Sequence, residues 1–182
     1  MQFIENIDTL ILMFIQNNFT GPLLDSFMVT ITSIGNAGCV WIVIGLILLF
    51  STKYRKYGIM LLSALLLCFI VGNLGLKPLI ARERPYNFNS AIKLLIDAPS
   101  DFSFPSGHTM TSFASAAVLY YMDQKLGVVA YILASAIAFS RLYLYVHYPS
   151  DVLVGLITGI LIAKIVVKLA DIIEENRKIN IS

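Results

Sequence analysis

The sequence has little charge. Of its 182 residues, 13% are charged and 58% are hydrophobic, and the mean hydropathy of +0.80 lies far outside the range of soluble domains of this size. This composition predicts an integral membrane protein. Because several spans of about 20 residues each leave little chain for a second domain, we expect a single membrane-embedded domain over residues 1–182.

Three further absences restrict the partners and sites that can be expected. The net charge of +2 is small and no basic run has aromatic residues interleaved with it, so nucleic acid is not an expected partner. The two cysteines, Cys39 and Cys68, lie in apolar stretches and are expected to be buried small hydrophobes, with neither a disulfide nor a metal site between them. No cleaved signal peptide is expected from the N-terminal residues.

Long apolar stretches predict an all-α fold, a polytopic membrane helical bundle. Residues 3–17 place apolar side chains on one helical face, which is typical of an amphipathic helix lying in the membrane interface. About five longer stretches should cross the membrane, with a bend at Gly35 and Asn36 in the first. These spans are expected at residues 24–50, 57–76, 106–122, 126–143 and 150–173, followed by a polar tail at residues 174–182 that lies on the membrane surface or is disordered.

Basic residues are unevenly divided between the two sides that five spans would create. Most share the side of the C-terminus, which we expect to be cytoplasmic; they are Lys53, Arg55, Lys56, Lys125, Lys164, Lys168, Arg177 and Lys178. A functional cluster on the opposite, extracytoplasmic side would explain the basic residues that break this rule. They are Lys77, Arg82, Arg84, Lys93 and Arg141.

Residues 140–151, with the sequence SRLYLYVHYPSD, place Arg141, His147 and Asp151 between two apolar runs. Charges at membrane depth are costly and therefore suggest a function. An arginine can hold a phosphate through its planar fork of donors, a neutral imidazole can attack phosphorus, and a carboxylate can orient that imidazole. A loop salt bridge beside a capped helix would explain the same residues, so the stretch alone leaves both interpretations open.

Two other segments carry complementary groups. Lys77 and Arg84 are seven positions apart, nearly two helical turns, so they could face one side, although Pro78 disfavours an unbroken helix between them. Snorkelling cations at the end of the second span would look the same. At the expected start of the third span, Ser106 and Gly107 offer a hydroxyl and free backbone N–H groups to an anion, unless Ser106 is only an N-cap.

The strength of the signal lies in the combination. The two histidines of the chain, His108 and His147, both fall at expected helix starts, and each lies near cations in the expected arrangement. We therefore expect the three segments to enclose one anion-sized pocket that performs phosphoryl transfer. Side-chain cations and a helix start could supply the positive charge around the phosphate oxygens, and no cluster at metal-ligand spacing is present, so neither metal nor cofactor is expected.

The three segments together resemble the signature motifs of the type 2 phosphatidic acid phosphatase family, most closely its small bacterial members. Residues 77–85 match its Lys-x6-Arg-Pro motif, residues 105–108 match Pro-Ser-Gly-His, and residues 140–151 match the third motif in type and spacing. The resemblance implies that His147 is the nucleophile, Asp151 its orienting partner and His108 the general acid. It also implies a set of phosphate-binding residues, with Arg82 ranked lower: Lys77, Arg84, Ser106, Gly107 and Arg141.

The same resemblance implies a metal-independent membrane lipid phosphatase with a phosphohistidine intermediate. Undecaprenyl diphosphate is the leading substrate, with phosphatidylglycerol phosphate and phosphatidic acid as alternatives, because the motifs contact only the phosphate. A lipid phosphotransferase and a non-catalytic channel or transporter are also considered. A vanadium-dependent haloperoxidase would share the motifs, but the apolar spans argue against such a soluble enzyme. Membrane lipids are the other expected partners, and the sequence does not predict an oligomeric state.

Overall fold

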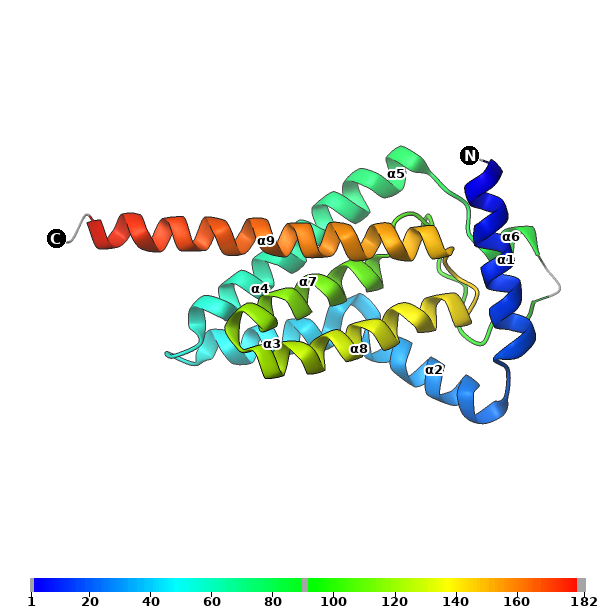
Figure 1. The fold of residues 1–182 in the computed structure, drawn as a ribbon, viewed down its shortest axis with the longest axis horizontal. Helices are drawn as coiled ribbons and strands as arrows, with labels where there is room; N and C mark the ends of the chain where they lie inside the picture. Colours follow the sequence, from blue (N-terminus) through cyan, green and yellow to red (C-terminus); the bar gives the residue numbers. More distant parts are fainter. Residues whose placement is uncertain (1, 90–91, 180–182) are drawn as a thin grey trace.

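Helix is the only regular structure in residues 2–89 and 92–179, the part of the chain that this computed structural model describes (Figure 1). The helices are α1 (Gln2–Asn18), α2 (Pro22–Ile34), η1 (Asn36–Gly38), α3 (Cys39–Phe50), α4 (Arg55–Cys68), η2 (Phe69–Leu76), α5 (Lys77–Ile80), α6 (Pro85–Phe88), α7 (Gly107–Met122), α8 (Gln124–Tyr143) and α9 (Pro149–Ile179). The long helices run back and forth along one axis, whereas α1 lies across one end of the bundle (Figure 1). The predicted all-α bundle is confirmed.

The number of membrane spans is close to, but not the same as, the prediction. Among the described residues, three runs are long and apolar enough to cross a membrane: Arg55–Phe88, α8 and α9. The pair α2 and η1–α3, bent by 42°, could supply a fourth, and its break confirms the bend expected at Gly35 and Asn36. Helix α7 has 16 residues, which at roughly 1.5 Å per residue is about 24 Å, short of the roughly 30 Å of hydrocarbon. The predicted count of about five is therefore approximate.

Helix α9 extends beyond its predicted end at residue 173 and continues to Ile179. Two ion pairs stabilise this extension, because Glu174 contacts Lys178 one turn later at 3.2 Å and Lys56 of α4 at 2.9 Å. Residues 174–179 thus form helix where a surface or disordered tail was expected, and the last three residues of that tail lie outside the described part of the chain.

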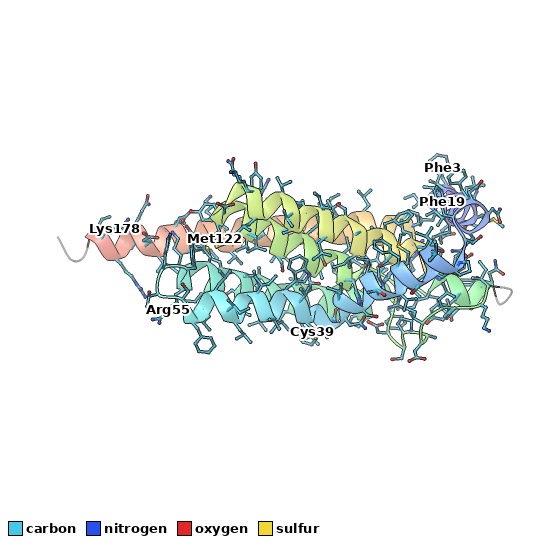
Figure 2. The ribbon with its side chains drawn as sticks, turned by 90° about the horizontal axis from the view of Figure 1, so that it is seen from below. Phe3, Phe19, Cys39, Arg55, Met122 and Lys178 are labelled. Atoms are coloured by element: carbon cyan, nitrogen blue, oxygen red, sulfur yellow. The ribbon has the colours of Figure 1, made fainter. Side chains whose placement is uncertain are left out.

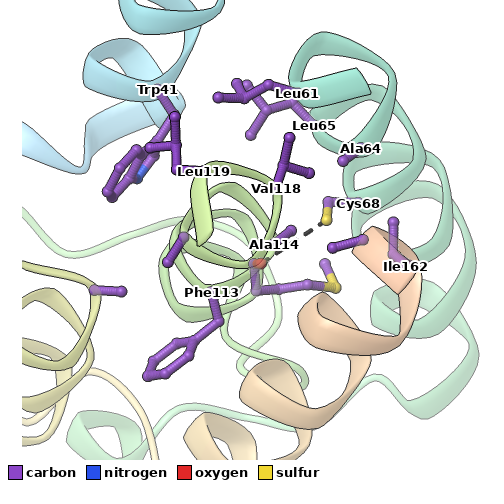
Figure 3. Close-up of a cluster of buried hydrophobic side chains, with 14 of the residues drawn as sticks. Trp41, Leu61, Ala64, Leu65, Cys68, Phe113, Ala114, Val118, Leu119 and Ile162 are labelled. Atoms are coloured by element: carbon purple, nitrogen blue, oxygen red, sulfur yellow. Dashed lines mark hydrogen bonds between the residues drawn. The ribbon is translucent and has the colours of Figure 1, made fainter. Parts of the chain in front are cut away.

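The hydrophobic core surrounds α7, which lies between α3, α4 and α9 (Figure 3). Trp41 is almost fully buried and donates its ring N–H to the hydroxyl of Ser112 at 2.9 Å. Cys68 is buried in this cluster as expected, but Cys39 is exposed on the bundle surface, so the prediction of burial was wrong for it. Both thiols are free.

Two glycines let α9 approach α7 very closely. A Cβ atom on Gly155 would lie 2.7 Å from the carbonyl oxygen of Ser106, and one on Gly159 would lie 2.3 Å from that of Met110. Any larger residue would force the helices apart, because real Cβ atoms do not approach backbone oxygens this closely. The starts of α7 and α9 are therefore held together backbone to backbone, and the amide of Ser106 donates to the carbonyl of Asp151 at 3.1 Å.

Helix α1 matches the amphipathic helix predicted at residues 3–17. Its large apolar side chains are mostly exposed, such as Phe3 at 76% and Phe14 at 59%, whereas Leu12 and Ile15 are buried against the bundle. Phe3 and Phe19 lie at the end of the molecule opposite Arg55 and Lys178 (Figure 2). Because an exposed apolar face across one end of the bundle suits the headgroup region of a membrane, the interfacial position stays the prediction for α1.

Candidate active site

One cavity brings together most of the predicted site residues. Its volume is about 1060 Å³, and it extends along α4 and η2 with the start of α7 on another wall. The predicted residues that line it are Lys77, Arg84, Gly107, His108, Arg141 and His147. Ser106 and Asp151 are fully buried beside these residues and outside the cavity wall. The expectation that both imidazoles face a common space agrees with this geometry.

His147 lies in the loop between α8 and α9 and is only 1% exposed. Its Nδ1 is 3.6 Å from Asp151 Oδ2 and 3.4 Å from the hydroxyl of Ser103, whereas its Nε2 is 3.2 Å from a terminal nitrogen of Arg84. Since arginine can only donate, this arrangement favours the tautomer with the proton on Nδ1 and a lone pair on Nε2. The lone pair then lies on the side of Arg84 and the cavity.

The environment keeps the His147 ring neutral. Burial is the main cause that lowers the pKa of His147 to about 3; the hydrogen bond with Asp151 opposes it, and the nearby charges of Arg84 and Arg141 act in the same direction as burial. A neutral imidazole is required of a nucleophile, because the protonated ring has no free electron pair.

Asp151, in the first turn of α9, is held by both of its oxygens. Oδ2 accepts from the Ser103 hydroxyl at 2.5 Å and from the Tyr148 amide at 2.9 Å, in addition to its approach to His147. Oδ1 accepts from Arg82 at 2.6 Å. With this many partners the carboxylate has one orientation, so it can fix the plane of the imidazole.

Lys77 and Arg84 converge on Asp101, a residue that the motif analysis did not single out. Asp101 accepts hydrogen bonds from the Lys77 ammonium and, at 2.7 Å, from the Arg84 guanidinium. Burial alone would raise the pKa of Asp101, but Lys77 and Arg84 outweigh it and lower the pKa to about 2. The carboxylate therefore stays ionised and neutralises part of the positive charge that an anion would meet.

The two cations do not share a helical face. The helix ends at Ile80, Ala81 adopts a left-handed conformation with φ of 49°, and Arg84 is extended. The suggestion that Lys77 and Arg84 lie on one face of a helix was therefore wrong. A short irregular segment instead returns Arg84 to the cavity. Pro78 lacks an N–H group, and the turns before it widen into the π-helix η2, a feature common at functional sites.

Arg141, near the end of α8, faces the same cavity from another side. One of its terminal nitrogens donates to the hydroxyl of Thr32, and its Nε is buried without a protein partner. A buried charged donor left unpaired is costly unless a ligand or water completes it. Arg141 is therefore well placed to bind an anion in the cavity.

The start of α7 supplies the remaining predicted groups. A Cβ atom on Gly107 would lie 3.6 Å from Asn73 Oδ1 and 4.0 Å from Lys77 Nζ, so the start of α7 lies directly beside the lysine. His108 lines the cavity and its Nε2 lies 3.0 Å from the side-chain oxygen of Asn36. Ser106 is the N-cap: its hydroxyl accepts from Thr109, so it is committed to the helix start.

Sequence reasoning missed the residues that support the motif side chains from elsewhere in the fold. Asp101 contacts Lys77 and Arg84, Ser103 contacts Asp151, and Asn36 contacts His108. Asp101 and Ser103 stand shortly before the Pro-Ser-Gly-His motif, and that proximity was the available signal. Within residues 2–89 and 92–179, no group of three histidine, cysteine, aspartate or glutamate side chains is arranged to hold a metal ion.

Comparisons with known proteins find relatives that are named as lipid phosphatases. An undecaprenyl-diphosphatase of Sulfolobus acidocaldarius is 33% identical over 75% of this chain, which covers 66% of that relative, a little under two thirds of its length. A lipid A 4'-phosphatase of Bacteroides thetaiotaomicron is 30% identical over 87% of this chain and 75% of its own. The crystal structure of a PAP2-type phosphatidylglycerolphosphate phosphatase from Bacillus subtilis superposes with a TM-score of 0.79 at 25% identity, covering 94% of this chain and 88% of the other.

These proteins are named for three different lipids, so what they share with this chain is the phosphatase framework rather than one substrate. The sequence model of the PAP2 superfamily matches residues 53–173, which is more than half of the chain and includes all three motifs. The chain therefore belongs to the PAP2 superfamily.

Proposed function

We propose that this protein is an integral membrane phosphatase that hydrolyses a lipid phosphate or diphosphate through a phosphohistidine on His147. The single observation that carries the proposal is the shared cavity, which is lined by three cations and two histidines in one part and by apolar side chains in another. A phosphorylated headgroup and a hydrocarbon chain require these two environments side by side.

The chemistry follows from the positions of the groups. The Nε2 lone pair of His147 attacks phosphorus, and the bond from phosphorus to the leaving oxygen breaks as His108 gives that oxygen a proton. Lys77, Arg84 and Arg141 stabilise the negative charge on the phosphoryl oxygens. Water, deprotonated by His108, then attacks the phosphohistidine, which releases inorganic phosphate and restores both histidines.

The apolar part of the cavity supports a lipid substrate. It is formed by side chains of α3, α4 and η2, among them Ile42, Leu62, Leu65, Leu66 and Phe69. Leu66 and Phe69 are also exposed on the outer surface of the bundle, so this wall continues to the lipid-facing side. A chain attached to the phosphate could therefore remain in the membrane during the reaction.

Undecaprenyl diphosphate, converted to undecaprenyl phosphate, is the leading substrate. It is supported by the similarity to the undecaprenyl-diphosphatase of Sulfolobus acidocaldarius. Phosphatidylglycerol phosphate is the second candidate, favoured by the structural likeness to the Bacillus subtilis enzyme. We place the site on the extracytoplasmic side, because the opposite end of the bundle carries basic residues such as Arg55 and Lys178 (Figure 2).

The test is a panel of competing lipid phosphates on purified protein in detergent with a chelator present. Undecaprenyl diphosphate, phosphatidylglycerol phosphate and phosphatidic acid would be offered together and free phosphate and each product quantified. Phosphate release that vanadate inhibits is the expected result, with the highest kcat/KM for undecaprenyl diphosphate. Transfer of the phosphoryl group to an acceptor lipid without free phosphate would show a phosphotransferase instead, and no turnover of any lipid would overturn the proposal.

A further inference from the structure

Asp8 is a buried carboxylate on α1, a helix whose large apolar side chains are mostly exposed. It is 2% exposed and lies one turn before Leu12, which is also buried. A charged group without partners at such a position would cost several kcal/mol. Its partners therefore indicate what the residue does.

The carboxylate of Asp8 binds the start of α9. Oδ1 accepts from the backbone amide of Ser150 at 2.9 Å, and Oδ2 accepts from the Ser150 hydroxyl at 2.5 Å. Pro149 and Ser150 open the helix whose next residue is Asp151. Asp8 thus satisfies a free N–H group of α9 from another helix and places a negative charge where the helix dipole favours one.

Arg82 connects Asp8 to Asp151. One of its terminal nitrogens donates to Asp8 Oδ2 at 2.7 Å, and the other donates to Asp151 Oδ1 at 2.6 Å and to the Ser150 hydroxyl at 2.7 Å. The guanidinium stacks 3.9 Å from the ring centre of Tyr148, which holds its plane. We name Asp8, Arg82, Ser150 and Asp151 the rear network, because none of them lines the cavity.

The rear network approaches His147 from the side away from the substrate. Asp151 uses Oδ1 for Arg82, which leaves Oδ2 for Ser103, Tyr148 and His147. If Asp8 were neutral, Arg82 would be balanced by Asp151 alone and would draw that carboxylate toward itself. The interaction of Asp151 with His147 would weaken, although no residue in the cavity had changed.

We propose that Asp8 is a positioning residue: through Arg82 it sets the carboxylate of Asp151 and thereby the imidazole of His147. This inference rests on the proposed function, in which His147 is the nucleophile. It assigns to α1 a part in the reaction, since a side chain of the predicted interfacial helix completes the support of the catalytic histidine.

The first experiment separates positioning from binding. Asp8→Asn keeps the size of the side chain and removes its charge, so kcat should fall by about 10-fold, the scale typical of supporting residues, while KM changes less than about 2-fold. Asp8→Glu restores the charge and should recover part of kcat. The matched control is Glu5→Gln, which removes an exposed carboxylate from the same helix and should leave kcat unchanged.

The second experiment tests the route through Arg82. In an Arg82→Gln background, adding Asp8→Asn should lower kcat by less than about a further 2-fold. The connection between Asp8 and Asp151 is already broken in that background, so the two changes are not independent. If the double variant lost kcat by the product of the two single losses, the proposal would be overturned. Full kcat in Asp8→Asn, or equal kcat in Asp8→Asn and Asp8→Glu, would overturn it as well. A failure of the proposed function would look different, because the unmodified protein would then release no phosphate from any lipid.

Discussion

The cavity and the rear network are both built from arginine and aspartate, but their charge balance differs. Toward the cavity there are three cations, Lys77, Arg84 and Arg141, and two carboxylates, Asp97 and Asp101, of which Asp101 binds two of the cations. In the rear network one cation, Arg82, lies between the two carboxylates of Asp8 and Asp151. The cavity thus has positive charge left for an anion, whereas the rear network has none.

The difference shows that the charge of a residue does not reveal its role in a buried cluster. Arg82 and Arg84 are two positions apart in one motif, yet Arg82 is closed between protein carboxylates and Arg84 faces both Asp101 and His147. Uncompensated charge is costly to bury, so it persists where a ligand completes it. Changes on the cavity side should therefore affect anion binding, and changes behind His147 should affect the rate.

The largest effect is expected at His147, where the two regions meet. His147→Ala removes the nucleophile and should reduce kcat by at least about 10⁴-fold. Phosphate release from the best lipid of the panel measures this, with the melting temperature of the variant as a control for folding. Retained turnover would contradict the assigned mechanism, and the cavity and the rear network could then no longer be described as two sides of the nucleophile.

Arg141→Gln should have the next largest effect. It removes a buried cation of the cavity, so kcat/KM should fall roughly 10²- to 10³-fold and the inhibition constant of vanadate should rise. Lys93→Gln removes an exposed cation from the loop before Asp101 and serves as the control. If Arg82→Gln weakened vanadate inhibition as strongly as Arg141→Gln, the division into two regions would be wrong.

The buried neutral His147 should make stability depend on pH. The pKa of His147 is lowered from 6.5 to about 3 in the folded protein. Below pH 6.5 the ring is therefore protonated in the unfolded chain while it stays neutral in the folded protein. Stability is complete above that pH and falls as the pH decreases, by roughly 2 kcal/mol at about pH 5. His147→Gln should remove this share of the slope in thermal unfolding curves, and an unchanged slope would show that the ring is not held neutral.

Asp101→Asn should have the smallest effect, a lower melting temperature without anions and a larger stabilisation by phosphate. It leaves Lys77 and Arg84 without their carboxylate partner, so the melting temperature without anions should decrease, by the equivalent of about 1 kcal/mol. Inorganic phosphate should then stabilise the variant more than the unmodified protein, because it can occupy the position of the lost charge. Equal stabilisation of both proteins would show that Asp101 and phosphate do not share these cations.

Much of the fold followed from the pattern of apolar residues. Runs of apolar side chains located the long helices, and Gly35 and Asn36 correctly marked the break between α2 and α3. The errors lie where local pattern competes with contacts from elsewhere. Helix α9 continues past residue 173, where Glu174 pairs with Lys56 of a distant helix as well as with Lys178, and no periodicity within the segment could reveal the pair with Lys56.

The site motifs were found because each is a short pattern of chemically active residues, and the supporting residues were missed because they belong to no such pattern. Asp101, Asn36 and Asp8 reach Lys77, His108 and Ser150 from segments with no motif of their own. Their roles depend on which loop returns to which helix start. That information exists only once the helices are packed.

The close approach of α9 to α7 has a consequence for movement. Gly155 and Gly159 bring the two backbones into contact, so the helix that follows His147 and the helix that carries His108 have little room to move relative to each other. Any widening of the entrance for a bulky lipid must then come from the opposite wall. The break at residues 35–38, between α2 and α3, would provide a hinge for such a movement. An outward movement of that wall would leave the spacing of the two imidazoles nearly constant.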